Sequence, residues 1–151
     1  MNPLKLFIKK ILSENYLTES EAYPFTFTTE GENYKYFFTI DDINYICAIY
    51  PNPWQRDYYD VAFITEGGTV KDRIGKDLNF FNSVLKTIAE CMKDFIRRKD
   101  VVRIIAFEGD RVREKAYVRF FKNHPYFSQF EIDDTHTKSG FVEIHVNKGT
   151  E

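Results

Sequence analysis

The spacing of apolar residues changes twice along the chain, and this change constrains the fold more than any other feature. Between Pro24 and Thr65 apolar side chains alternate with polar ones or form short apolar runs, which is typical of β-strands. From about Asp77 to Arg98 they recur every three or four residues, which predicts one long amphipathic helix. Strand patterns return after this helix, so we expect an α+β domain in which the helix packs on a sheet.

The expected elements run in the order helix, four strands, long helix, strand, short helix and two strands. An amphipathic helix is expected at Pro3–Glu14, a polar linker at Thr18–Glu21, and the short helix at Arg111–Lys122. Strands are expected at Phe25–Thr28, Tyr34–Ile40, Tyr45–Tyr50, Tyr58–Thr65, Val101–Phe107 and Phe141–Val146, with a weak strand near Phe130–Ile132. The strand, helix and strand from Tyr58 to Phe107 have the length of a parallel crossover. We therefore predict a mixed, twisted sheet of about six strands.

Two of these strands lie deep in the predicted sheet. Tyr45–Tyr50 and Tyr58–Thr65 are apolar at nearly every position, with Asp60 as the exception in the second strand. Strands that are covered on both faces have this composition. We therefore expect both of these strands to lie deep in the sheet.

Length and composition fit one domain. The chain has 151 residues, of which 43% are hydrophobic and 29% charged, as in an ordinary globular protein. We expect a single domain over residues 1–151, with a helix and linker in 1–22 and the α+β core in 23–147. Lysines interrupt the apolar residues of the first segment, so neither a signal peptide nor a membrane span is expected, and we predict a cytoplasmic location.

Few residues are placed for catalysis or metal binding. Cys47 and Cys91 lack the paired spacing of a zinc site, and we expect them to be reduced and buried. The histidines His124, His136 and His145 are not at a two-histidine helical spacing, and His145 is expected to be exposed or peripheral. No nucleophile motif is present. The sequence therefore predicts no metal site, no cofactor and no catalytic residue.

Charge is distributed unevenly. Residues 71–122 carry 14 Lys and Arg against 8 Asp and Glu, whereas the chain as a whole has a net charge of -2. The short helix concentrates this charge at Arg111, Arg113, Lys115 and Arg119. A basic surface of this kind suits an anionic partner such as nucleic acid. Solvent-facing helix positions also take basic residues for solubility, and we favour this second interpretation because no base-stacking aromatics are interleaved on that face.

A second candidate surface is the loop that contains the single tryptophan. Trp54 lies between Pro53 and Gln55, close to Arg56, in a loop that two prolines keep out of regular structure. Trp and Arg are the residue types that most often anchor interfaces, and a stiff loop loses little entropy on binding. The alternative is that Trp54 folds back onto the sheet edge, and the sequence leaves both possibilities open.

From Tyr34 to Val146 the order of elements resembles that of the GNAT acetyltransferase superfamily. Ile105-Ala106-Phe107 and the Arg113 to Tyr117 segment of the short helix are similar to those of small, degenerate GNAT-like proteins of bacteria and phages. The resemblance implies a GNAT-like fold, acetyl-CoA as a ligand and Tyr117 as the general acid. At the turn before the long helix, where such enzymes bind pyrophosphate, Asp72 and Asp77 occupy positions at which a carboxylate would repel it.

These observations predict an accessory or interaction protein that binds a macromolecular partner without catalysis. A protein partner is favoured, nucleic acid is the second possibility, and no membrane partner is expected. The candidate contact residues are Trp54, Arg56, Arg111, Arg113, Lys115 and Arg119. The alternative is a GNAT-like acyltransferase that uses acetyl-CoA, with Tyr117 as general acid and the turn from Arg73 to Asp77 as cofactor site.

Overall fold

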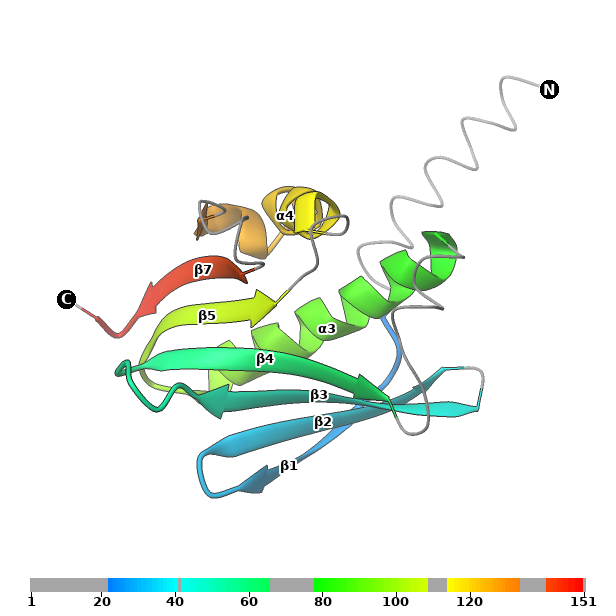
Figure 1. Cartoon of the computed structure of the whole chain (residues 1–151), viewed down its shortest axis with the longest axis horizontal. Coiled ribbons are helices and arrows are strands. Elements are labelled where there is room, and N and C mark those ends of the chain that lie inside the picture. Colours follow the sequence, from blue (N-terminus) through cyan, green and yellow to red (C-terminus); the bar gives the residue numbers. More distant parts are fainter. Residues whose placement is uncertain (1–21, 41, 66–77, 109–113, 134–140, 151) are drawn as a thin grey trace.

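The computed structural model describes residues 22–40, 42–65, 78–108, 114–133 and 141–150. Within these residues the protein is an α+β domain with a seven-stranded mixed sheet and two α-helices (Figure 1). The expected helix at Pro3–Glu14, the linker at Thr18–Glu21 and the turn at residues 71–77 lie outside the described residues. Among the described helices none is long and apolar enough to cross a membrane.

The sheet has the strand order β1-β2-β3-β4-β5-β7-β6. The strands are β1 (Thr26–Glu30), β2 (Asn33–Ile40), β3 (Ile43–Pro51), β4 (Tyr58–Thr65), β5 (Val102–Glu108), β6 (Glu131–Asp133) and β7 (Phe141–Lys148). The helices are α3 (Leu78–Arg98), α4 (Glu114–Asn123) and the 3-10 helix η1 (Phe127–Gln129). β4 and β5 pair in parallel, and every other neighbouring pair is antiparallel.

The strands predicted at Phe25–Thr28 and Tyr34–Ile40 are confirmed, and the second shows the predicted alternation. β1 and β2 form an antiparallel hairpin around Gly31, which has a φ of 62°, a conformation that glycine adopts at little cost. In β2 the side chains of Tyr36 and Phe38 are buried, whereas those of Phe37 and Thr39 are exposed. The period of two therefore separates a core face of the sheet from an outer face.

Both helices pack on the core face. Met92 and Phe95 of α3 are fully buried, and the Phe95 ring makes edge contacts with Tyr34 of β2 and Tyr59 of β4. Phe121 of α4 packs against Phe107 of β5 on the same face. Figure 1 shows α3 running across the sheet, with α4 beside β5 and β7. One apolar core thus joins both helices to strands β2 to β7.

The number of strands differs from the expectation, whereas the position of the two apolar strands agrees with it. The sheet has seven strands and not about six, because the weak segment at 131–133 does pair with β7 as an edge strand. β3 and β4 lie inside the sheet, as expected, but their outer face is partly open: Ile64 is 51% exposed and Tyr50 is also exposed. The described helices cover only the core face, and this leaves part of the outer face accessible.

His124 directly follows α4 and organises the turn after this helix. Its ring Nδ1 accepts hydrogen bonds from the backbone N–H groups of Tyr126 and Phe127, at 3.1 and 3.4 Å. Burial, reinforced by the positive charges of Lys93 and Lys86, lowers the pKa of His124 to about 4. The imidazole is therefore neutral near pH 7, which is the state that can accept both bonds.

Because the pKa of His124 is lowered in the folded protein, we predict that the protein loses stability in mild acid. The unfolded chain takes up a proton at His124 near pH 6.5, whereas the folded chain does so only near pH 4, so stability decreases as the pH falls through this window. We expect His124 to account for about 1–2 kcal/mol of the decrease between pH 7 and 4.5. His124→Asn keeps an acceptor oxygen but has no titrating group, so urea unfolding at both pH values should show a smaller decrease for this variant. An equal decrease would contradict the assignment.

Candidate functional site

The loop of residues 52–57, which we call the Trp54 loop, joins β3 to β4 and is held by its own first residue. The Asn52 side-chain oxygen accepts hydrogen bonds from the backbone N–H groups of Trp54 and Gln55, at 2.8 and 3.1 Å. Its amide nitrogen donates to Asp60 of β4 at 3.1 Å. An Asn that bonds the backbone two and three residues ahead fixes a tight turn. The loop conformation is therefore set before any partner binds.

Arg103 of β5 supports the same loop from the neighbouring strand. Its backbone N–H donates to the Asp57 carbonyl at 2.8 Å, and its guanidinium donates to the Arg56 carbonyl and to the Gln55 side chain, each at 3.3 Å. Asp57 has a φ of 54°, an uncommon conformation for a residue other than glycine. The Trp54 loop is thus anchored at both of its ends.

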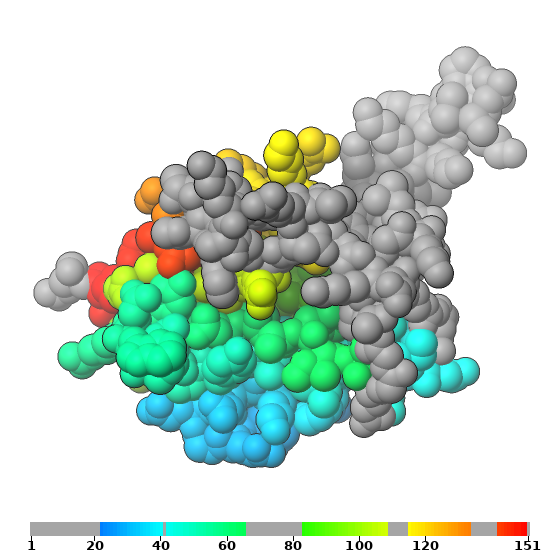
Figure 2. Space-filling model, in the orientation of Figure 1, coloured from blue at the N-terminus to red at the C-terminus, as the bar shows by residue number. Residues whose placement is uncertain are grey.

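The structure resolves the two interpretations of Trp54. Its side chain is 88% exposed and does not fold back onto the sheet edge. Arg56 is also exposed, and its only described ion pair, with Asp57, is long at 3.7 Å. In Figure 2 the hairpin that carries this loop projects from the body of the molecule, at the left of the view. A large aromatic side chain is thus presented to solvent on a fixed backbone.

An apolar pocket of about 70 Å³ lies at the opposite end of β4. The pairing of β4 with β5 ends at Val61 and Phe107, although β4 continues to Thr65, and Figure 1 shows the two strands diverging. The pocket is lined by residues of β4, α3, β5 and α4: Val61, Phe63, Val84, Leu85, Ile88, Phe107, Glu108, Tyr117 and Phe121. Pockets at the carboxyl ends of parallel strands are common ligand sites.

Tyr117 supplies a polar group to the wall of this pocket. It lies on α4, and its ring meets Phe107 edge-on with the centroids 5.8 Å apart. Glu108, at the end of β5, is the only charged residue among the described residues of the lining. The arrangement can hold a short apolar group with one hydroxyl and one carboxylate near it.

The two described basic candidates of the short helix, Lys115 and Arg119, do not form one surface with the Trp54 loop. Lys115 and Arg119 are exposed on α4, four residues apart and hence on one side of the helix, while Arg111 and Arg113 lie outside the described residues. α4 follows the carboxyl end of β5, whereas the Trp54 loop contacts Arg103 near the start of β5. The two candidate surfaces therefore lie at opposite ends of this strand.

The remaining candidate residues of the sequence are Cys47, Cys91 and His145. Cys47 and Cys91 are reduced and fully buried, as expected. His145 is partly buried beside Asp133 and Glu143, and this group is the set of described residues that could hold a metal ion. The sequence analysis did not bring these three residues together.

Comparison with protein families, with curated proteins and with solved structures finds no match to this chain.

Besides the grouping of Asp133, Glu143 and His145, two functional features were missed in the sequence. Asn52 could have been found, because an Asn between two prolines is a strong turn signal. The pocket has no local signal, since it depends on where the parallel strands β4 and β5 separate.

The Trp54 loop should lose its order when Asn52 is replaced. Asn52→Ala removes two backbone contacts and the contact to Asp60, and we expect the free energy of unfolding to fall by about 1–2 kcal/mol. Because Trp54 is the single tryptophan, time-resolved fluorescence anisotropy reports directly on this loop, and its fast component should grow. Gln55→Ala, which removes only a side-chain contact to Arg103, is the matched control. Unchanged anisotropy in Asn52→Ala would refute the role of Asn52.

Proposed function

We propose that this protein is a small cytoplasmic accessory protein that acts by binding a protein partner through the Trp54 loop. One observation carries the proposal: Trp54 is 88% exposed on a loop whose conformation is already fixed. An exposed tryptophan is costly to leave in water and gains much when it is buried in an interface. Since the loop is ordered beforehand, binding loses little conformational entropy.

The basic side of α4 is the second candidate surface. Lys115 and Arg119 support an anionic partner, such as nucleic acid, at this position. Without aromatic side chains interleaved among them, they offer charge and no base stacking. We therefore place the anionic partner second to a protein partner.

Affinity capture from a lysate of the source organism tests both surfaces. Trp54→Ala should lose the partner, whereas Ile64→Ala, which truncates another exposed apolar side chain on β4, should retain it. Capture through the Trp54 loop should change little between low and physiological salt, because a mostly apolar interface releases few counterions. Undiminished capture by Trp54→Ala would refute the proposal.

Loss of capture in Arg111→Glu/Arg113→Glu would instead favour the anionic partner, provided that the wild-type protein also captures steeply less of its partner as the salt concentration rises. The Trp54→Ala variant is the control for that result, because it leaves the basic helix intact. The two outcomes separate the two surfaces.

The pocket between β4 and β5 supports a second candidate function. We infer a GNAT-like fold, supported by the succession β2, β3, β4, α3, β5, α4, β6 and β7 along the chain. In such a fold the pocket beside Tyr117 would accept the acyl end of a thioester, with the Tyr117 hydroxyl as general acid. Asp72 and Asp77 oppose this function, because carboxylates there would repel a pyrophosphate.

Titration calorimetry with acetyl-CoA decides between binding of a partner alone and acyl transfer. We expect no binding in the micromolar range. Micromolar binding by the wild type that is lost in Ile88→Phe, which fills the pocket, would establish the second function. In that case Tyr117→Phe should still bind the thioester and should lose at least about 100-fold in turnover, the usual contribution of a general acid.

A further inference from the structure

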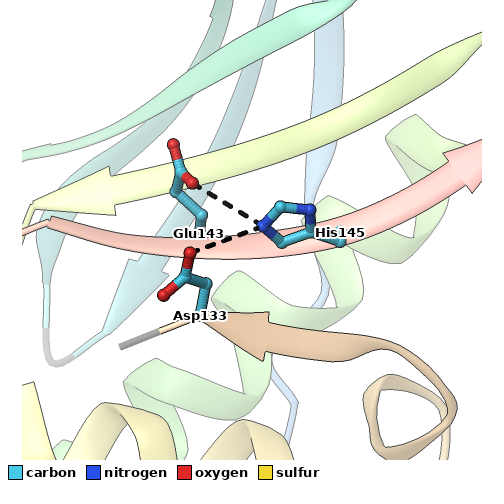
Figure 3. Close-up of side chains that lie close together, drawn as sticks. All are labelled: Asp133, Glu143 and His145. Carbon is cyan, nitrogen blue, oxygen red and sulfur yellow. Dashed lines mark ion pairs between the residues drawn. The ribbon is translucent and has the colours of Figure 1, made fainter. Parts of the chain in front are cut away.

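Three side chains that are distant in sequence meet on the outer face of the sheet. Asp133 lies on β6 directly opposite Glu143 of β7, and His145 follows Glu143 by two residues on the same face of β7. The ligand atoms of the three side chains all lie within 4.8 Å of one another. Figure 3 shows the imidazole of His145 facing both carboxylates. We call these residues the Asp-Glu-His cluster.

His145 Nε2 is the least satisfied atom of the cluster. It is buried and has no hydrogen-bond partner among the residues that the structure describes. It lies 3.6 Å from a Glu143 oxygen and 3.9 Å from an Asp133 oxygen, and both distances are longer than a hydrogen bond. Two ligands bound tetrahedrally to one Zn²⁺, with bonds of about 2.0–2.2 Å, are separated by about 3.4 Å. The two distances from His145 Nε2 exceed this separation by only a few tenths of an ångström, and all three ligand atoms lie within 4.8 Å of one another.

A second layer of contacts holds Glu143 in place. The Tyr58 hydroxyl donates a hydrogen bond of 2.5 Å to the other Glu143 oxygen, which leaves Oε1 facing His145. Burial raises the pKa of the Tyr58 phenol above its usual value, and the hydrogen bond to Glu143 adds to the increase, so the phenol remains a donor. Metal-binding carboxylates commonly have such outer partners, which fix their orientation.

The backbone around the cluster is already in position. β7 is paired with β5 on one side and with β6 on the other. Beside the cluster, on the same face of the sheet, Tyr58, Ile104 and Ala106 form a small buried apolar group. Ligands on paired strands are held more precisely than ligands on loops.

We propose that Asp133, Glu143 and His145 bind a divalent first-row transition-metal ion, for which Zn²⁺ is the best match. One imidazole nitrogen and two carboxylate oxygens form a three-ligand set that suits Zn²⁺ and leaves a fourth position for water. Mg²⁺ and Ca²⁺ favour sites made entirely of oxygen ligands, and the imidazole disfavours both ions. The proposal does not depend on the function of the Trp54 loop.

Titration calorimetry of the untagged, chelator-treated full chain with Zn²⁺ tests the proposal. We expect one Zn²⁺ per chain, and no saturable binding of Mg²⁺ under the same conditions. Co²⁺ should give a visible spectrum without a thiolate charge-transfer band, because the buried cysteines take no part. A thiolate band, or the absence of saturable Zn²⁺ binding, would overturn the proposal.

Variants locate the site. His145→Gln and Asp133→Asn should each weaken Zn²⁺ binding by more than tenfold, and Tyr58→Phe should weaken it by about tenfold. Glu131→Gln is the matched control, since Glu131 lies opposite His145 on β6 but is not in the cluster. Thermal melts should show that each variant folds, and Glu143→Gln replaces any variant that does not. Equal affinity in the folded cluster variants and in Glu131→Gln would show that Zn²⁺ binds elsewhere.

Discussion

The parallel pairing of β4 with β5 is the contact on which the rest of the arrangement depends. It is the single parallel pair in the described sheet, and α3 provides the connection between its two strands. The chain must cross the core face to make this pairing, and it thereby buries Phe95 and Met92 against the sheet. Every candidate site lies close to one of these two strands or to β7, which pairs with β5.

The two ends of the pair have different properties. At the start of β5, Arg103 reaches the Trp54 loop and fixes it, and this leaves an aromatic side chain in solvent on an ordered backbone. At the carboxyl ends, the strands separate after Val61 and Phe107, and apolar side chains with Tyr117 line the space between them. Binding of a partner and binding of a small ligand would thus use opposite ends of the same strands and need not exclude each other.

The sequence was most informative where one segment determines its own structure. The alternation of β2 and the three-to-four spacing of α3 predicted both elements, because each pattern follows from a local backbone period. The exposure of Trp54 was left open, since only the contacts of Asn52 and Arg103 decide where the loop points. The bonds of Arg103 join residues nearly 50 positions apart.

The Asp-Glu-His cluster could not be predicted in the same way. Glu143 and His145 share a face by their spacing of two, but Asp133 joins them only through the register between β6 and β7. That register depends on the packing of Ile132 and Ile144 into the core, which is not a local property. The short β6 was the weakest strand pattern in the sequence, and it carries one of the three ligands.

The register of the central strands is the most direct test of this account. In the NMR spectra of a labelled sample, we expect backbone NOEs of parallel pairing between Tyr58–Val61 and Ile104–Phe107. Cross-strand contacts between β4 and β5 should end beyond Val61, where the strands separate. NOEs of antiparallel pairing between these strands, or contacts between β5 and β4 that continue to Thr65, would contradict the account.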